Sequence, residues 1–341
     1  MASSLLLAGP RRSQFCRCDG VPFRGRIDAP RRGSVSSGMS SKIDWALATV
    51  VSGGVAVGCI EWGGGLYALE PVLARAGLPG MRGVMDLFPV WERVLVALGA
   101  AELGDGDRVI EEGRLAPLLY PGKIICAGAN YFDHLAEMGM PDAKKADQRL
   151  FFFMKPPRNA VVGPGDTVHM PLGTKAFDWE VEMAAVIGRR ARNVSEADAL
   201  SHVAAYTVAI DFSARDHNRA PETFYKLDWV AGKAQDTCCP MGPRLVPAGA
   251  FGDAQDVGLG LSVNGVVKQD ARTSGMIFGI AEQIAIASRI MTLDPGDVIL
   301  TGTPAGVGVP KGTFLSVGDR VSAHVEGIGT LDVCIQPAIE G

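Results

Sequence analysis

The clearest alternation of apolar and polar positions lies at residues 177–188, where the sequence reads FDWEVEMAAVIG. Side chains of a β-strand point to opposite faces with a period of two. One face then carries Phe177, Trp179, Val181 and Met183. The other face carries Asp178, Glu180 and Glu182. A helix would turn Glu180 away from the other two acids, and the bulky apolar residues favour a strand. We therefore expect a strand whose apolar face lies in a core.

Three carboxylates on one face of a strand repel one another unless water or a cation lies between them. A solvated sheet edge would account for the pattern. However, the acids lead directly into the apolar run AAVIG at residues 184–188, which is typical of a buried strand. The sequence therefore raises the hypothesis that a cation neutralises these acids.

Elsewhere the patterns predict a mainly β protein with a few helices. Strands are expected at residues 45–70, 149–155, 204–212, 259–269, 293–308 and 317–335. Helices are expected at residues 70–77, 85–102, 195–203 and 276–291. Pro89 should interrupt the second of these helices, and Asn264-Gly265 should form the turn of a β-hairpin. The fold class that follows is α+β.

Composition narrows the range of partners. The chain has 341 residues, a net charge of −4 and a pI of about 5.8, so it lacks the basic surface that is typical of nucleic-acid binding. The longest apolar segment, residues 45–60, is short, contains Gly-Gly and ends at Glu61, so no membrane span is expected. The seven cysteines are scattered without a C-x-x-C pair, which is typical of reduced thiols in an intracellular protein.

Residues 1–38 differ from the rest of the chain, because they hold many arginines and serines and few acids. This segment is either an organelle transit peptide or the product of an over-extended gene start at which Met39 is the true beginning. We expect disorder there in both cases. A small N-terminal α/β domain over residues 39–115 and a catalytic domain over residues 116–341 should follow. The expected location is the cytoplasm, or an organelle if residues 1–38 target the chain.

Glu180 and Glu182 would need a further ligand from elsewhere in the chain to hold a metal. Asp211 is a candidate, because it lies at the polar end of an apolar strand in VAIDFSARD. Three carboxylates with water form a set of hard oxygen ligands that suits Mg²⁺, Mn²⁺ or Ca²⁺ rather than zinc. Scattered acids are common in enzymes, so the residues alone leave both interpretations open.

His134 and Glu137 lie three residues apart in NYFDHLAEMG, so they would be neighbours on a helical turn. A carboxylate beside an imidazole fixes its tautomer and raises its basicity, which would let the pair act as a general base on water. An ordinary His–Glu contact on a surface turn is the alternative.

Lys155, Arg215 and Lys233 lie in apolar or turn sequence. Cations in such settings are better candidates than surface charges to bind an anionic substrate or a developing oxyanion. The glycine-rich segment TGTPAGVG at residues 301–308 lacks the spacing of a phosphate-binding loop. It is either a plain turn or a loop whose N–H groups and Thr303 hydroxyl face a carboxylate.

Seven segments in this order resemble the fumarylacetoacetate hydrolase family over residues 121–335. They are GANYFDHLAEMG, FFFMKPP, FDWEVEMAAVIG, IDFSARD, GKAQDTCCPMGP, SVNGVVKQ and LDPGDVILTGTPAGVG. The resemblance implies a mixed β-sandwich roll, a homodimer, and a divalent metal held by three carboxylates, Mg²⁺ or alternatively Mn²⁺ or Ca²⁺. It also implies that the partner is a small keto or diketo acid.

The resemblance further implies a role for each candidate residue. The metal ligands correspond to Glu180, Glu182 and Asp211. The catalytic residues correspond to His134, Glu137 and Lys233, of which Lys233 would stabilise an oxyanion. The substrate contacts correspond to Arg215, Lys155 and Thr303. Asp178 would support the metal ligands from outside.

The expected reaction is hydrolytic cleavage of a carbon–carbon bond in a β-diketo acid of the acylpyruvate or fumarylacetoacetate kind. The His134–Glu137 pair would activate the water, and Lys233 would stabilise the oxyanion. Two alternatives use the same site. One is isomerisation or decarboxylation of a 2-hydroxyhepta-2,4-diene-1,7-dioate-type acid in aromatic catabolism, and the other is hydrolysis of a diketo sugar acid. A non-catalytic module in which Ca²⁺ only stabilises the sheet is a rival from another class.

Overall fold

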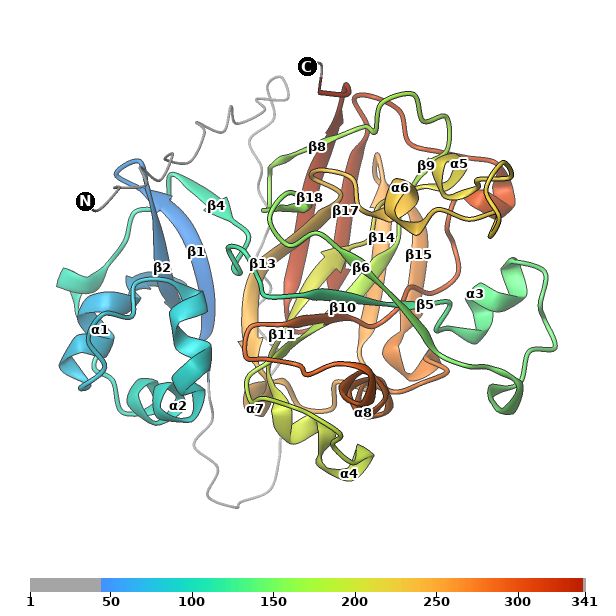
Figure 1. Cartoon of the computed structure of the whole chain (residues 1–341). Helices are drawn as coiled ribbons and strands as arrows, with labels where there is room; N and C mark the ends of the chain where they lie inside the picture. Colours follow the sequence, from blue (N-terminus) through green and yellow to red (C-terminus); the bar gives the residue numbers. More distant parts are fainter. Residues whose placement is uncertain (1–43, 340–341) are drawn as a thin grey trace, which may run out of the picture.

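The computed structural model describes residues 44–339, and its central layer is one mixed sheet of 11 strands (Figure 1). The main strands run in the order β3-β2-β1-β13-β11-β10-β16-β5-β6, with β4 paired to β1 and β7 paired to β13. The bounds are Ala46–Ser52 (β1), Val55–Trp62 (β2), Gly65–Ala68 (β3), Gly113–Leu115 (β4), Ile124–Gly128 (β5), Phe151–Lys155 (β6), Val161–Val162 (β7), Val181–Ile187 (β10), Val203–Ile210 (β11), Cys239–Pro247 (β13) and Val298–Leu300 (β16). The segment 1–38 lies outside the described residues.

A second sheet of five strands packs against one face of the first, in the order β15-β14-β17-β18-β8. Its strands are Thr167–His169 (β8), Gly258–Val263 (β14), Val266–Arg272 (β15), Arg320–Val325 (β17) and Gly329–Gln336 (β18). A short ribbon pairs Phe177–Asp178 (β9) with Ser213–Ala214 (β12). The larger core lies between the two main sheets, where apolar residues of β10 and β11 meet those of β14, β17 and β18. This mainly β, α+β sandwich confirms the predicted fold class.

Helices cover the outer face and the ends of the large sheet (Figure 1). The α-helices are Leu69–Arg75 (α1), Trp91–Gly99 (α2), Phe132–Glu137 (α3), Glu196–Ala199 (α4), Arg215–Asn218 (α5), Trp229–Lys233 (α6), Ala248–Phe251 (α7) and Ile280–Ile290 (α8). The 3₁₀-helices are Val84–Val90 (η1), Asp105–Asp107 (η2), Lys145–Asp147 (η3), Leu200–His202 (η4), Thr273–Gly275 (η5) and Val309–Lys311 (η6). A second core cluster joins α1, η1 and α2 to the face of the large sheet that lies opposite the sandwich.

Local sequence explains most of these boundaries. Pro89 lies in the 3₁₀ turn of η1, and the α-helix begins only at Trp91, as the predicted break requires. Asn264 and Gly265 have φ angles of 51° and 78°, which matches the turn expected in a tight β-hairpin. The helix predicted at residues 276–291 starts later, at Ile280, because Glu282 accepts a hydrogen bond from the Gly279 N–H and caps the helix there.

One face of β10 packs in the sandwich core, and the other carries the acidic residue Glu182. Phe177, Trp179, Val181 and Met183 all belong to the sandwich core, as the alternation predicted. Glu182 lies on the opposite face, which continues into the second cluster through Ala184 and Val186. The predicted strand at residues 177–188 is interrupted between β9 and β10, at Trp179 and Glu180.

Strand pairing brings distant segments together at the beginning of β10, at one end of the strands of the large sheet. β10 and β11 pair with Val181 opposite Ile210, and the Asp211 N–H donates to the Glu180 carbonyl at 2.9 Å. Leu300 of β16 pairs with Ala184 on one side and with Cys126 of β5 on the other. The segments that follow β5, β11 and β16 therefore meet the beginning of β10.

The strands before residue 115 extend the same sheet, since β1 pairs with β13 through Leu47 and Leu245. The division into domains at residue 115 stays a prediction. Within residues 44–339, no helix has the length and apolar character needed to cross a lipid bilayer. Cys59, Cys126, Cys238 and Cys239 are buried thiols and form no disulfide.

Candidate active site

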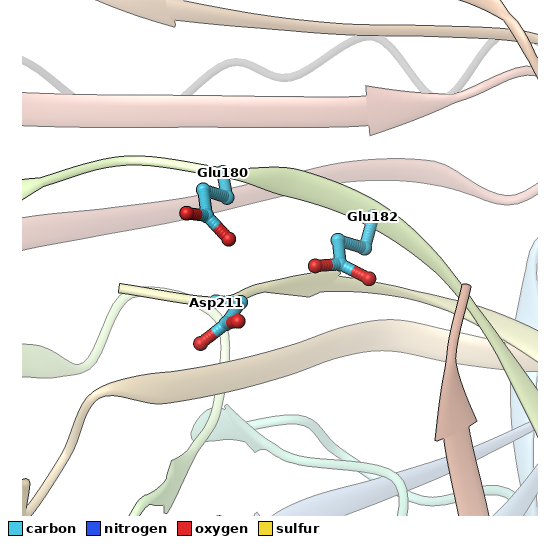
Figure 2. A group of neighbouring side chains, drawn as sticks. All are labelled: Glu180, Glu182 and Asp211. Atoms are coloured by element: carbon cyan, nitrogen blue, oxygen red, sulfur yellow. The ribbon is translucent and has the colours of Figure 1, made fainter. Parts of the chain in front are cut away.

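Three buried carboxylates meet where β10 begins and β11 ends (Figure 2). One carboxylate oxygen from each of Glu180, Glu182 and Asp211 lies within 4.8 Å of the other two. The strand pairing accounts for this cluster, because it places Glu180 beside Asp211 and Glu182 two residues further along, on the same face of the strand. Three buried hard oxygen donors from rigid strands fit a divalent cation such as Mg²⁺ or Mn²⁺.

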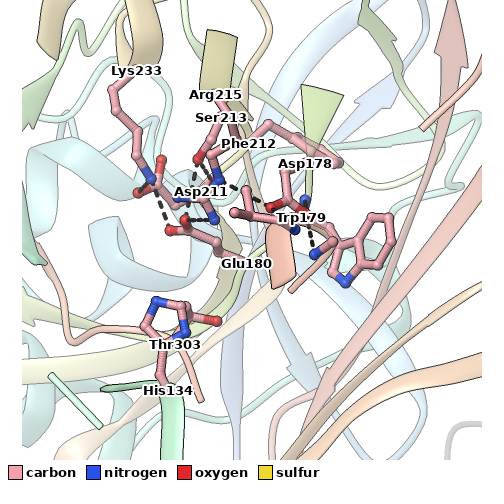
Figure 3. A network of polar contacts seen from close by, with 12 residues as sticks. His134, Asp178, Trp179, Glu180, Asp211, Phe212, Ser213, Arg215, Lys233 and Thr303 are labelled. Carbon is pink, nitrogen blue, oxygen red and sulfur yellow. Dashed lines mark hydrogen bonds and ion pairs between the residues drawn. The ribbon is translucent and has the colours of Figure 1, made fainter. Parts of the chain in front are cut away.

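Two cations contact Glu180 directly (Figure 3). The Lys233 Nζ lies 2.8 Å from Glu180 Oε2 and 2.7 Å from Asp211 Oδ2, and Arg215 Nη2 lies 2.6 Å from Glu180 Oε1. Burial opposes ionisation of Glu180, but Lys233 and Arg215 outweigh it and hold the pKa of this carboxyl well below its usual value. Glu180 is therefore ionised at neutral pH.

Glu182 has a different electrostatic setting from Glu180. Burial, together with the charges of Asp211 and Glu180, raises the pKa of Glu182 well above its usual value. The N–H of Gly302 donates to Glu182 Oε2 but does not offset these effects. A divalent cation bound to the three acids would favour the ionised form of Glu182.

Lys155 is the most enclosed cation of the site. Its side chain is 0% exposed, and its Nζ lies 2.6 Å from Asp211 Oδ1. The same ammonium donates to the carbonyls of Phe212 at 2.9 Å and Lys233 at 2.6 Å. Two of the three N–H groups of the ammonium thus donate to main-chain carbonyls, and the contact with Asp211 is an ion pair. The structure places Lys155 against Asp211, and its predicted contact with a substrate stays a prediction.

The expected pair of His134 and Glu137 forms on α3, with 2.7 Å between His134 Nδ1 and Glu137 Oε1. Glu137 Oε2 also accepts the N–H of Gly306 at 2.9 Å. Burial opposes ionisation of Glu137, but these contacts with His134 and Gly306 outweigh it and lower its pKa. An ionised Glu137 accepts a hydrogen bond from the Nδ1–H of His134, which leaves the lone pair of the imidazole on Nε2. Figure 3 shows His134 facing the side of the site that carries Glu180.

Thr303 lies in the loop that follows β16, beside His134 (Figure 3). Its hydroxyl donates to the Val181 carbonyl at 2.9 Å and accepts the Gln269 side-chain N–H at 2.8 Å. The hydroxyl therefore ties the loop to the beginning of β10, in addition to any contact with a substrate.

The glycine-rich loop, residues 301–308, holds protein carboxylates with its main chain. Besides Glu182 and Glu137, it receives Asp178, whose Oδ1 accepts the Gly308 N–H at 2.7 Å. Gly306 has a φ of 108°, and a side chain there would overlap the carbonyl oxygen of Lys268. The sequence left open a plain turn and a loop whose N–H groups face a carboxylate. The loop N–H groups do face carboxylates, and those carboxylates are the protein's own.

Asp178 lies outside the acid trio and supports it through Arg215. The Arg215 Nε is 3.0 Å from Asp178 Oδ2, while the other end of the guanidinium contacts Glu180. This bridge fixes Arg215 against the trio. The role of Asp178 as a support of the metal ligands stays a prediction.

Two residues of the site were not singled out from the sequence. Gln269 accepts the Val181 N–H at 2.9 Å and donates to Thr303 and to the Pro304 carbonyl, so it joins the second sheet to the loop. Ser213 donates to Glu180 Oε1 at 3.2 Å. Both lie inside segments that carry the family resemblance, SVNGVVKQ and IDFSARD, and that was their only signal in the sequence.

Comparison with known proteins shows which family the chain resembles. The family model described as "Fumarylacetoacetate (FAA) hydrolase C-terminal" matches residues 123–336. The chain is 42% identical over 219 residues to "Oxaloacetate tautomerase fahd2, mitochondrial" of Xenopus laevis, a match that covers 64% of this chain and 66% of that one. The match therefore spans just under two thirds of that relative.

Solved structures also resemble this one, and two of them are hydrolases. Fumarylacetoacetate hydrolase from the psychrophilic Exiguobacterium antarcticum has a TM-score of 0.70 and 31% identity, and the likeness covers 86% of this chain and 99% of that chain. Fumarylpyruvate hydrolase from Pseudomonas aeruginosa, in complex with Mn²⁺ and pyruvate, has a TM-score of 0.58 and 30% identity, with 67% and 93% covered.

Proposed function

Because the chain belongs to the fumarylacetoacetate hydrolase family, we propose that it is a divalent-metal-dependent enzyme that interconverts the keto and enol forms of a 2-oxo dicarboxylic acid such as oxaloacetate. One observation carries the proposal: an imidazole oriented by a carboxylate, His134 with Glu137, stands at the same site as three buried acids. The relative from Xenopus laevis, named an oxaloacetate tautomerase, supports the choice of reaction.

Each residue of the site would have a separate role in this reaction. Glu180, Glu182 and Asp211 would hold the metal, which when bound would polarise the substrate's keto group and make the neighbouring C–H bond more acidic. His134 would accept a proton from that carbon at Nε2, and the imidazolium, paired with Glu137, would return it to the enol oxygen. The reverse path runs from enol to keto through the same nitrogen.

Positive charge at the site suits an anionic substrate. Lys233 and Arg215 both lie against Glu180, and each would attract a substrate carboxylate to the acid trio. Lys155 would act through Asp211, because its ammonium is fully buried against that carboxylate and donates to two main-chain carbonyls.

Carbon–carbon bond hydrolysis of an acylpyruvate is the second candidate. The likeness to fumarylpyruvate hydrolase favours it, and the same His134–Glu137 pair could deprotonate an attacking water. Lys233 would then stabilise the tetrahedral oxyanion. The two reactions differ in outcome, because only hydrolysis releases two products and places an oxygen atom of water in a new carboxylate.

The test follows the enol absorbance of oxaloacetate with and without added Mg²⁺ or Mn²⁺, and it follows product release from acylpyruvates in ¹⁸O-labelled water. We expect metal-dependent relaxation of the oxaloacetate absorbance, and we expect it to fall about 10²–10⁴-fold in His134→Ala, the range that general acid–base groups contribute. The matched control is His324→Ala, an exposed histidine on β17. Full activity of His134→Ala would contradict the proposal, whereas label in a new carboxylate would select hydrolysis.

We also propose that the enzyme is a homodimer, which its family membership supports, and that Mg²⁺ is the resident metal, with Mn²⁺ able to replace it. Light scattering of the purified chain tests the first statement. Activity of metal-depleted protein after addition of each ion tests the second. A location in the cytoplasm or an organelle stays a prediction.

A further inference from the structure

The ammonium of Lys233 lies between two carboxylates of the acid trio. It is 2.8 Å from Glu180 Oε2 and 2.7 Å from Asp211 Oδ2, and the Lys233 side chain is only 5% exposed. Glu180 and Asp211 are also two of the three residues that would coordinate a divalent cation. A metal ion and an ammonium that share the same two carboxylates lie close enough to repel each other strongly.

The three cations of the site are anchored in different ways. Lys155 is fixed by two main-chain carbonyls in addition to Asp211. Arg215 is fixed by Asp178 in addition to Glu180. Lys233 has no such extra anchor among residues 44–339: its hydrogen-bond and ion-pair partners are Glu180 and Asp211 alone, with the ring of Phe153 4.9 Å away.

Lys233 is therefore the cation that can leave the acids at the lowest cost. Its side chain is unbranched and flexible, and it extends from the last residue of the short helix α6. Movement of the ammonium away from one acid would break no contact with the main chain.

We propose that Lys233 is an internal counter-cation that competes with the divalent metal for Glu180 and Asp211, and that metal binding releases its ammonium toward the substrate. This inference rests on the metal-dependent function proposed above. It gives one lysine two successive tasks: it neutralises the acids while no divalent ion holds them, and it meets the substrate's oxygen once such an ion does. Metal loading would in this way prepare the substrate site.

The test is a Mn²⁺ titration of the full chain without substrate, in which electron paramagnetic resonance measures the free ion. Lys233→Met removes one positive charge a few ångströms from the metal, so we expect it to bind Mn²⁺ about tenfold or more tightly than the unchanged protein. The matched control is Lys226→Met. Lys226 is exposed, lies in the segment between α5 and α6, and donates a hydrogen bond from its ammonium to the Pro221 carbonyl at 2.6 Å. The Lys226→Met variant should bind Mn²⁺ like the unchanged protein.

Equal or weaker Mn²⁺ binding by Lys233→Met, beside normal binding by the unchanged protein, would overturn the competition and leave the metal-dependent function standing. Absence of Mn²⁺ binding in every variant would overturn both. Lys233→Gln keeps a hydrogen-bond donor for the acids and removes only the charge. It serves if Lys233→Met fails to fold, and the same tightening is expected.

Discussion

Two ion pairs of nearly identical length lie in opposite settings. In the N-terminal part, Arg75 Nη2 and Asp107 Oδ2 are 2.6 Å apart, and the arginine side chain is 53% exposed. At the acid trio, Lys155 Nζ and Asp211 Oδ1 are also 2.6 Å apart, and both side chains are 0% exposed. Water and salt screen the first pair, so it contributes little to stability.

The buried pair has another consequence. Removal of Lys155 would leave the buried Asp211 with Lys233 as the one cation in contact with it, whereas a pair of apolar residues would be as stable or more so. At the acid trio the costly buried charges lie where a cation and an anionic substrate would use them. The distance between two charged groups therefore does not set how much an ion pair contributes to stability. The burial of the two groups does.

The largest effect that would sharpen this comparison is expected from Glu182→Gln. This substitution removes a buried acid that no cation of the site contacts, so metal affinity and activity should fall about a hundredfold or more, at least as much as loss of a supporting residue costs. The folded state should keep its stability or gain some, because the desolvated charge is gone. Calorimetric Mn²⁺ binding and thermal unfolding measure both. A variant that lost stability and kept its metal would refute this account.

The next effect concerns the two ion pairs themselves. Lys155→Met should lower the free energy of unfolding by about 3–5 kcal/mol, because Asp211 would stay buried without its closest cation. Arg75→Met breaks the pair of equal length in which the arginine is 53% exposed and Asp107 is 7% exposed, and it should shift the urea midpoint less than Lys155→Met does. Urea titrations at constant pH compare the two variants. Equal shifts of the urea midpoint in the two variants would show that burial does not determine how much an ion pair contributes to stability.

The smallest effect is a pH dependence at Glu137. Its pKa in the folded chain lies below the ordinary value of 4.5, so the ionised form stabilises the fold. That contribution is fully present above about pH 4.5 and is lost as the pH falls through the lowered pKa. The stability difference between the unchanged protein and Glu137→Gln should therefore shrink as the pH is lowered from neutral into this range. Urea unfolding at several pH values measures it, and a constant difference would contradict the assignment.

The sequence predicted features that depend on local periodicity. The apolar face of residues 177–183, the hairpin at Asn264-Gly265 and the turn that unites His134 with Glu137 all follow from spacing along one element. The association of Asp211 with Glu180 was a reasonable expectation, because each lies at an end of a strand expected to be buried. Only the observed pairing of β10 with β11 shows how close Asp211 and Glu180 lie.

The features that the sequence could not supply depend on contacts between distant segments. The sequence could not show that the Lys155 ammonium donates to the carbonyls of Phe212 and Lys233, because these contacts depend on the fold. The bonds from the glycine-rich loop were hidden for a different reason. They are made by main-chain N–H groups, which every residue but proline has, so no side-chain pattern records them.

One turn of main chain receives carboxylates from separate parts of the protein: Glu137 from α3, Glu182 from β10, and Asp178 from the residues before it. Glu137, which orients the proton-transfer imidazole, and Glu182, which would bind the ion, are thus held by the same loop. A displacement of this loop would move both side chains together and preserve the distance between them. Substitutions that shift it would weaken the two activities in concert, and selection could tune one apart from the other only through residues elsewhere.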